Sequence, residues 1–133
     1  MVNAIMDDLD GTLAHMNGKR SPHDWHAVMK DDLDVPIANL TRHYKNVIIM
    51  SGRDEVCRKE TTEWLNKHDI RYDKLVMRPT NDNRPDEIVK WELYQLHVEP
   101  DYKIEFVLDD RDKVVKMWRK NGLKCLQVAE GDF

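Results

Sequence analysis

The chain alternates five short apolar runs with amphipathic segments, and this alternation constrains its fold more than any other feature. The runs are rich in β-branched and aromatic residues, as is typical of strands that are buried on both faces. We therefore expect strands at residues 2–7, 46–50, 74–77, 104–108 and 124–128. Between the runs, apolar residues recur every three or four positions, which predicts helices at 37–44 (after Pro36), 54–67, 86–97 and 111–121.

Strands that alternate with helices predict an α/β fold, a three-layer sandwich around a five-stranded, mostly parallel sheet. The 133 residues contain no linker, repeat or low-complexity segment, so we expect one domain over residues 1–133. Residues 14–45 separate the first two strands and are expected to form a minimal cap or helical insertion. Because such sheets bind ligands beyond the carboxyl ends of their strands, a site is expected just after residue 7.

Composition excludes several classes of protein. The net charge of −4 provides no overall basic surface for nucleic acid, so an anionic partner requires a local cluster of Lys and Arg. No apolar stretch approaches the roughly 20 residues of a membrane span, and the first residues lack a signal-peptide pattern. Cys57 and Cys125 are far apart and are expected to be reduced, partly buried thiols. We expect a cytoplasmic protein without membrane contact.

Three carboxylates, Asp7, Asp8 and Asp10, lie at the end of the first apolar run. Side chains of an extended segment alternate between its two faces, so Asp8 and Asp10 can share one pocket while Asp7 points elsewhere. Acids this close repel one another, which requires a bound cation or a retained proton. An EF-hand calcium loop starting at Asp8 would need Gly and Glu at the positions of Leu13 and Lys19, which excludes that motif.

Four motifs follow one another in order, at the ends of expected strands or in an expected helix. They are Asp8-Leu9-Asp10-Gly11-Thr12, Ser51-Gly52-Arg53, Lys90 and Asp109-Asp110. In this order they resemble the haloacid dehalogenase (HAD) superfamily of phosphatases, which use an aspartate nucleophile on a HAD-like, Rossmannoid sheet. From about residue 2 to the last residue, the chain further resembles the 3′-phosphatase domains of bacteriophage polynucleotide kinase-phosphatases. Gly18-Lys19-Arg20 does not form a phosphate-binding P-loop, so we expect no kinase half.

Asp8 is the expected nucleophile, because a carboxylate can form an aspartyl-phosphate and split hydrolysis into two steps. Its attack on a phosphate meets repulsion, so a cation is required, and Mg²⁺ takes one or two carboxylates together with substrate oxygens. The expected ligands are Asp8 and Asp110, with Asp109 as a further candidate, and the resemblance adds the backbone carbonyl of Asp10. The charge of Asp8 favours a protonated Asp10, which can give a proton to the leaving alcohol and later take one from water.

Ser51 and Lys90 complete the expected catalytic set. The Ser51 hydroxyl can donate to the transferred phosphoryl group, and Lys90 can neutralise charge while it orients Asp8. Asp86 lies four residues before Lys90. Their i, i+4 pair is expected either to fix the lysine or to be an ordinary surface pair.

Substrate binding is expected from cations around these motifs. Arg53 can hold phosphate oxygens with two hydrogen bonds. The resemblance places Lys19, Arg78 and Arg111 near the substrate, and Arg20, next to Lys19, can take the same part. As an alternative, Lys19 and Arg20 are solvated surface charges. The other expected members of the substrate-binding set are Thr12, Gly52 and Asp86.

Aromatic side chains allow two interpretations. Trp25, together with His23 and His26, lies beyond the first motif, where it can stack on a base or pack as a partly buried residue. Trp64, Trp91 and Trp118 lie on helical faces and are expected in the core.

The segments between the motifs leave no room for a large lid, so we expect an open site that admits the end of a polymer. The leading interpretation is a Mg²⁺-dependent phosphatase that acts on a 3′-phosphate at DNA or RNA ends. A separate kinase or ligase is a further expected partner, and the oligomeric state stays open. The alternatives are a small-molecule phosphatase of the same superfamily and a receiver-like phosphoacceptor domain. A receiver would need an acceptor Asp after the third strand, where Arg78-Pro79 stand.

Overall fold

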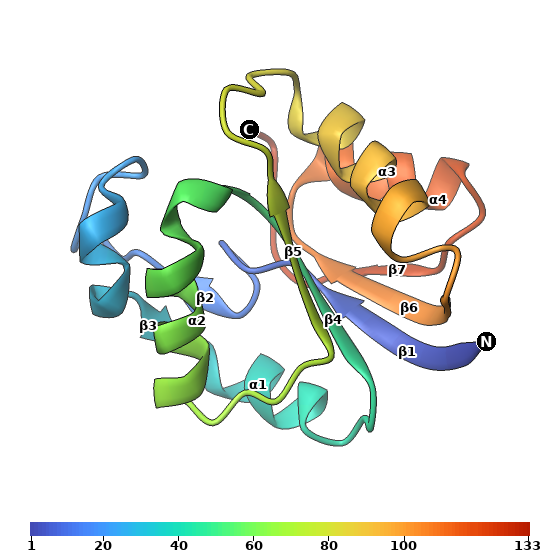
Figure 1. Ribbon diagram of the computed structural model, residues 1–133, viewed down its shortest axis with the longest axis horizontal. Coiled ribbons are helices and arrows are strands. Elements are labelled where there is room, and N and C mark those ends of the chain that lie inside the picture. Colours follow the sequence, from blue (N-terminus) through green and yellow to red (C-terminus); the bar gives the residue numbers. More distant parts are fainter.

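The structure is a computed structural model that describes all residues from Met1 to Phe133. Its centre is a sheet of five parallel strands in the order β5-β4-β1-β6-β7 (Figure 1). The strands are β1 (Val2–Asp7), β4 (Val47–Asp54), β5 (Lys74–Arg78), β6 (Tyr102–Asp109) and β7 (Cys125–Gln127). The predicted five-stranded α/β sheet is confirmed.

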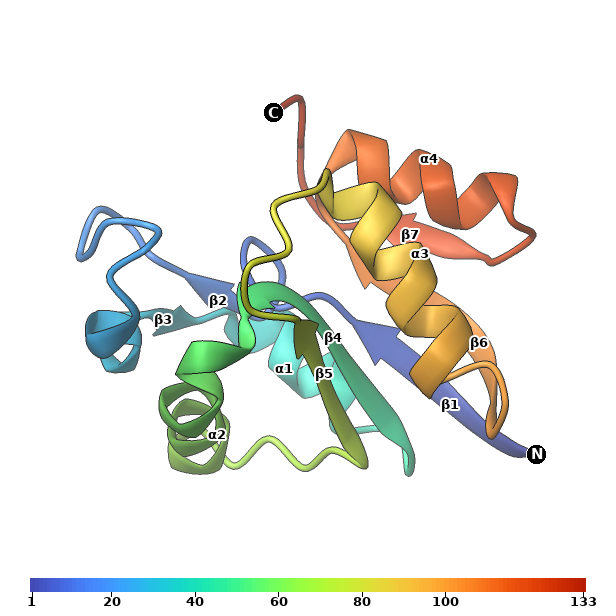
Figure 2. The ribbon, with the colours of Figure 1, turned by 45° about the horizontal axis from the view of Figure 1, so that its top comes forward.

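Two pairs of helices cover the two faces of the sheet (Figures 1 and 2). Helices α3 (Asp86–His97) and α4 (Asp112–Lys120) cover one face, and α1 (Val35–Thr41) and α2 (Arg58–Lys67) cover the other. Each face has its own apolar cluster, which contains one fully buried tryptophan, Trp118 of α4 or Trp64 of α2. Trp91 is partly buried against the α3/α4 cluster. The three tryptophans expected in the core therefore pack there.

The start of α3 brings an acidic side chain, Asp86, and a basic one, Lys90, to one edge of the sheet. Pro85 stands just before the helix, and Asp86 and Glu87 in the first turn suit the positive end of the helix dipole. His97 suits the opposite end, and the helix occupies the predicted residues 86–97. Lys90 follows Asp86 by one turn, so both side chains lie near the carboxyl ends of the strands.

β4 is longer than expected and carries the second motif inside the strand. It continues to Asp54, and its pairing with β5 shifts register between Ser51 and Asp54. The Asp54 carboxylate accepts a hydrogen bond from the backbone N–H of Val56 and starts a 3-10 turn, η2 (Glu55–Cys57). Helix α2 therefore begins at Arg58 instead of residue 54.

A small cap precedes α1. It contains β2 (Ala14–His15), η1 (Trp25–Lys30) and β3 (Asp32–Leu33), of which β2 and β3 pair antiparallel and η1 packs beside α2. These elements were not predicted, because two-residue strands show no period in a sequence. Helix α1 buries Ala38 against the sheet, so the second half of the 14–45 segment belongs to the sandwich. The cap is minimal, as predicted.

The strand order excludes the receiver-like alternative. Numbered along the chain, the five strands of the main sheet lie in the order 3-2-1-4-5. Receiver domains have the order 2-1-3-4-5. The chain leaves β1 first toward β4 and β5 and later toward β6 and β7, so the crevice beyond β1 is the switch point where such sheets bind ligands.

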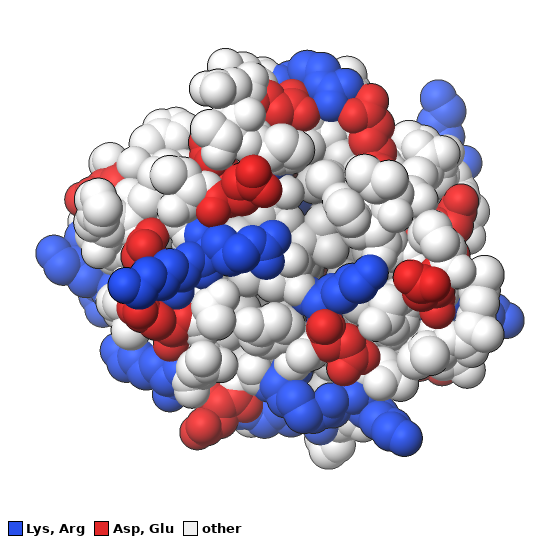
Figure 3. Space-filling model, in the orientation of Figure 1, with Lys and Arg blue, Asp and Glu red and all other residues white.

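Surface charge is mixed on the face shown in Figure 3, where Lys and Arg alternate with Asp and Glu. None of the helices combines the length and the apolar character that crossing a membrane requires.

Cys57 and Cys125 are free and buried, and burial raises the pKa of Cys125 to about 12. Thiols in such surroundings are poorly reactive, which agrees with a role in the core.

Candidate active site

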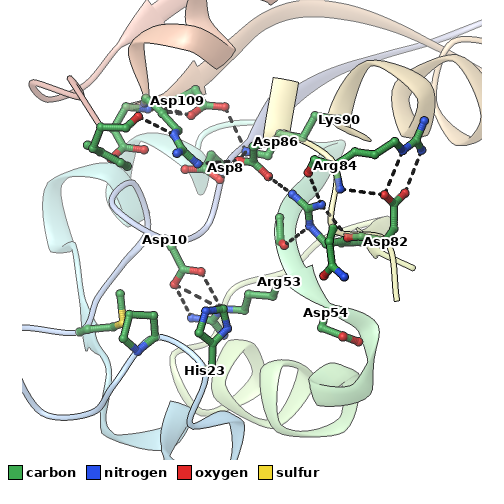
Figure 4. Close-up of a pocket in the computed structure, with 18 of the residues that line it drawn as sticks. Asp8, Asp10, His23, Arg53, Asp54, Asp82, Arg84, Asp86, Lys90 and Asp109 are labelled. Atoms are coloured by element: carbon green, nitrogen blue, oxygen red, sulfur yellow. Dashed lines mark hydrogen bonds and ion pairs between the residues drawn. The ribbon is translucent and has the colours of Figure 1, made fainter. Parts of the chain in front are cut away.

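A pocket of about 430 Å³ opens at the carboxyl end of the sheet (Figure 4). Its walls come from the loop after β1, the end of β4, the start of α3 and the segment after β6. The structure brings ten of the predicted site residues together here: Asp8, Asp10, Gly52, Arg53, Arg78, Asp86, Lys90, Asp109, Asp110 and Arg111.

Asp8 is the first residue after β1, and protein donors fix both of its oxygens. Oδ1 accepts a hydrogen bond from Lys90 Nζ (2.8 Å), and Oδ2 accepts one from the Thr12 hydroxyl (3.1 Å). Burial alone would lower the pKa of Lys90, but the carboxylates around it, with Asp109 as the largest contributor, outweigh burial and raise that pKa. Lys90 therefore stays charged and orients the carboxylate of Asp8.

The two acids at the carboxyl end of β6 have different contacts. Asp109 accepts hydrogen bonds from Lys90 Nζ and Trp118 Nε1 (both 3.3 Å) and from the backbone N–H of Asp110. The Asp110 carboxylate instead lies against Gly11, where an added Cβ would stand 2.1 Å from Asp110 Oδ2. Gly11 also has a φ of +83°, so glycine is required at this turn on both grounds. The bare Gly11 lets Asp110 approach the loop that carries Asp8.

Three carboxylates, those of Asp8, Asp109 and Asp110, have oxygens within 4.8 Å of one another. Burial raises the pKa of Asp8 and of Asp110, and the charge of Asp109 adds to both shifts. Lys90 alone does not balance three carboxylates. A buried set of hard oxygen ligands with surplus negative charge fits a Mg²⁺ ion. The carboxylate of Asp10 lies outside this set, and the proposed contact through its backbone carbonyl stays a prediction.

Asp10 points away from the cluster and toward Arg53 (Figure 4), and Arg20 lies beside it as well. Arg53 Nε and Nη2 donate to its carboxylate at 2.8–3.2 Å, and Arg20 Nη2 lies 3.7 Å away. This contact with Arg53 was not part of the sequence-based expectation, and the proton transfer expected of Asp10 stays a prediction.

Asp31, between η1 and β3, is a site residue that the motifs did not reveal. Its fully buried carboxylate pairs with Arg20 and with Arg53 at 2.7–2.9 Å, and its carbonyl accepts a hydrogen bond from Trp64 Nε1. Asp31 thereby joins the cap to α2 and holds both arginines beside Asp10. The adjacent acids Asp31 and Asp32 are the available sequence signal, and they do not indicate which of the two is buried.

Four predicted residues do not line the pocket. Lys19 is half exposed and pairs with Asp32 (2.6 Å) outside the pocket, so its part in substrate binding stays a prediction. The Arg20 side chain is 1 % exposed and donates to Asp31, so it holds the cap beside the site, and its part in substrate binding stays a prediction. Thr12 is buried beneath Asp8. Ser51 is buried, and its Oγ accepts a hydrogen bond from the Arg53 backbone N–H (3.1 Å), so its role as a phosphoryl donor stays a prediction.

Asp86 joins three basic side chains at the pocket wall. Its Oδ1 accepts from Arg78 Nη2 (2.8 Å), while Oδ2 lies 3.8 Å from Lys90 Nζ and 3.9 Å from Arg111 Nη1. The Asp86–Lys90 pair is therefore part of the site rather than an ordinary surface pair. Gly52 lies directly beside it, since an added Cβ would stand 2.3 Å from Asp86 Oδ1.

Three aromatic side chains line the pocket, those of His23, Trp25 and Phe133. His23 is exposed and lines the pocket near Asp10 and Arg53, whereas His26 does not line it (Figure 4). Trp25 is partly buried against the α1/α2 cluster and also lines the pocket, so both interpretations of this side chain stay open. Phe133 also lines the pocket and was not predicted as a site residue.

Comparison with known proteins, by sequence and by structure, finds similarity to polynucleotide kinase phosphatase domains and their relatives. The family model described as the polynucleotide kinase PNKP phosphatase domain matches residues 2–133. A protein of Autographa californica nuclear polyhedrosis virus, named as a bifunctional polynucleotide kinase/RNA ligase, is 33 % identical over 123 residues, which cover 87 % of this chain and 18 % of the viral protein.

Solved structures agree with this match. A chain in a Pnkp1/Rnl/Hen1 complex is 43 % identical with a TM-score of 0.96, and the match covers 100 % of this chain and 47 % of that one. A second structure, of the Pnkp1/Rnl/Hen1 RNA repair complex, gives 43 % identity and a TM-score of 0.95, covering 99 % and 44 %. A haloacid dehalogenase-like hydrolase from Streptococcus pneumoniae, 16 % identical with a TM-score of 0.63, shares the fold over 95 % of this chain and 84 % of its own.

This chain spans less than half the length of the viral protein and of the two chains from the Pnkp1/Rnl/Hen1 structures. Within that span, the four HAD motifs converge on one pocket at the switch point of the sheet. The family model covers every residue that lines this pocket. The chain therefore belongs to the family of polynucleotide kinase PNKP phosphatase domains, which are phosphatases of the HAD type.

Proposed function

We propose that this chain is a Mg²⁺-dependent phosphatase that removes a 3′-phosphate from the end of DNA or RNA through an aspartyl-phosphate. The observation that carries the proposal is the carboxylate of Asp8, which Lys90 and Thr12 hold in an open pocket with two further acids beside it. Phosphoryl transfer requires an aligned nucleophile and compensation of charge, and this arrangement supports both.

The proposed reaction has two steps. In the first, an Asp8 oxygen attacks phosphorus, and the bond from phosphorus to the 3′-oxygen of the nucleotide breaks. Asp10 gives its proton to that oxygen, which leaves as the 3′-hydroxyl. In the second step, water attacks phosphorus, Asp10 takes a proton from the water, and the Asp8 carboxylate leaves. The products are the 3′-hydroxyl end and inorganic phosphate.

Asp10 needs a proton before the first step and must accept one in the second. Arg53 donates to the Asp10 carboxylate and fixes it at the pocket, where it can transfer a proton in both steps.

Asp8 and Asp110 would hold Mg²⁺, with Asp109 next to them. When bound, the ion supplies positive charge between the carboxylate and the phosphate. Lys90 contributes a fixed positive charge of the protein at the same place, and its contacts with Asp8 and Asp109 keep both carboxylates in position.

Four arginines line the pocket, and they differ in the donors that they have free. Arg53, Arg78 and Arg84 direct guanidinium nitrogens to carboxylates or backbone carbonyls of the protein. Arg111 donates from Nε to the Phe133 carbonyl, whereas its two terminal nitrogens form no hydrogen bond. Arg111 is therefore the arginine best able to bind an oxygen of the substrate phosphate.

The size of the cap favours a polymer as substrate. Only β2, η1 and β3 stand above the sheet on this side, and they leave the pocket open to solvent. The names of the family and of the viral relative point to polynucleotides. We further propose a separate kinase or ligase as a partner, because a related chain is part of a Pnkp1/Rnl/Hen1 RNA repair complex.

Phosphate release from 3′-phosphorylated DNA and RNA oligonucleotides, measured with Mg²⁺ over a range of salt concentrations, tests the proposal. Asp8→Asn should abolish release. Asp7→Asn is the matched control and should retain it, because Asp7 contacts Thr41 in the other layer of the fold. Hydrolysis of small phosphomonoesters without any release from the oligonucleotides would refute the substrate proposal and favour the small-molecule alternative.

A further inference from the structure

Phe133 is a large apolar residue at the rim of a pocket that is lined mostly by charged side chains, and it is 61 % exposed. Arg111 holds it from one side. The Arg111 Nε donates to the Phe133 carbonyl at 2.8 Å, and the guanidinium carbon lies 5.1 Å from the centre of the phenyl ring. A cation at this distance is attracted to the ring and steadies it. The rest of the ring surface faces solvent.

The segment before Phe133 is tied to the loop that carries the catalytic acids. The backbone N–H of Asp112 donates to the Gly131 carbonyl at 2.9 Å, and the Gln127 amide donates to the Asp110 carbonyl at 3.0 Å. Gly131 packs so closely that an added Cβ would stand 1.8 Å from the Asp110 carbonyl oxygen. The position of the ring is therefore fixed relative to Asp110 and to the pocket.

An exposed ring at this place does not serve the phosphate, which needs cations and hydrogen-bond donors. It does suit the neighbouring part of a nucleotide, because every base has an apolar face that stacks on an aromatic side chain. Arg111 connects the two functions, since its Nε and its charge hold Phe133 while its terminal nitrogens, which form no hydrogen bond, face the pocket beside Asp86.

We propose that the Phe133 ring stacks on the terminal nucleobase of the strand whose 3′-phosphate enters the pocket. This inference rests on the proposed polynucleotide substrate and adds a binding site for the base. Stacking of this kind contributes about 1–3 kcal/mol for each base and tolerates any base. The site therefore gives a preference for nucleotide ends over other phosphomonoesters without a preference for sequence.

The test compares two oligonucleotides that differ only at the terminal nucleoside, which carries a base in one and is abasic in the other; both end in a 3′-phosphate. The unaltered chain should prefer the base-bearing substrate about 5- to 150-fold in kcat/KM, mainly through KM. Phe133→Ala should remove this preference, and Phe133→Trp should keep it. Leu96→Ala is the control, because Leu96 is similarly exposed (68 %) on α3 but does not line the pocket.

Hydrolysis of p-nitrophenyl phosphate shows that each variant is folded. If the unaltered chain shows no preference, or if Phe133→Ala slows both oligonucleotides equally, the stacking site is refuted while the proposed function stands. If the unaltered chain hydrolyses p-nitrophenyl phosphate but neither oligonucleotide, the proposed function fails, and the stacking site fails with it.

Discussion

Asp7 provides the sharpest test of the physical picture, because a carboxylate is buried there without a cation. Its side chain is 0 % exposed at the end of β1, and it points into the layer of α1 and α2. Its one hydrogen bond comes from the Thr41 hydroxyl (2.5 Å), while Oδ1 has no partner. Burial raises the pKa of Asp7 from 3.8 to about 7, although the Thr41 hydrogen bond opposes the shift.

The sign of the effect on stability follows from proton binding. Between about pH 4 and pH 7 the folded chain keeps the Asp7 proton and the unfolded chain has lost it, so the free energy of unfolding falls as pH rises. The difference of about 3 pH units corresponds to about 4 kcal/mol, at about 1.4 kcal/mol for each unit. Below this window Asp7 costs little, and above pH 7 the whole penalty is present.

Asp7→Asn removes the titration and keeps the shape of the side chain, including an oxygen that can accept the Thr41 hydrogen bond. Urea unfolding of both chains at several pH values between 5 and 8, in EDTA, measures the effect. We expect the stability of the variant relative to the unaltered chain to rise by about 3 kcal/mol over this range, which is the part of the window above pH 5. Phosphate release with Mg²⁺ should be retained.

Asp101→Asn is the matched control, because the Asp101 side chain is 71 % exposed and its substitution should leave the pH dependence unchanged. A stability difference between Asp7→Asn and the unaltered chain that stays constant from pH 5 to pH 8 would refute the buried, proton-binding carboxylate. Loss of phosphate release in Asp7→Asn, with retention in Asp8→Asn, would overturn the assignment of the nucleophile.

Other parts of the site respond to simple changes. Asp31→Asn leaves the buried charges of Arg20 and Arg53 without a shared partner, and we expect it to lower the free energy of unfolding by about 3 kcal/mol in urea denaturation. Gly52→Ala sets a methyl group against Asp86 and should cost about 1–3 kcal/mol and slow phosphate release in the same assays. EDTA should stop phosphate release, and Mg²⁺ should restore it and raise Tm, because an ion that binds only the folded chain stabilises it. A Tm that does not respond to Mg²⁺ would argue against a metal at the clustered carboxylates.

The sheet and its helices were predictable because buried parallel strands and amphipathic helices leave periodic signals in a sequence. Helix α3 occupies its predicted residues, and β5, β6 and β7 end within two residues of prediction. The end of β4 was not predictable, because Ser51-Gly52-Arg53 lacks the apolar residues that mark a strand. Its extension depends on pairing with β5, a contact between segments that are distant in sequence.

The site was predictable where roles depend on motif order and less so where they depend on burial. Lys19 and Arg20 are adjacent cations, and only the fold shows that Arg20 is buried against Asp31 while Lys19 pairs with Asp32 on the surface. The same applies to Arg53, whose contact with Asp10 joins residues 43 positions apart. Long-range ion pairs leave no periodic trace, so a sequence shows the charges without their partners.

The three acids at the end of β1 show what the fold adds to such a cluster. Alternation along the strand sends Asp7 toward α1 and Asp8 toward α3, while the turn at Gly11 carries Asp10 toward β4. Each carboxylate then meets a different donor: a hydroxyl, an ammonium or a guanidinium. A hydroxyl leaves the buried carboxylate of Asp7 uncompensated, an ammonium orients the carboxylate of Asp8, and a guanidinium holds that of Asp10. Neighbouring residues of one type therefore acquire three different surroundings, and the same Asp→Asn substitution should have a different effect at each.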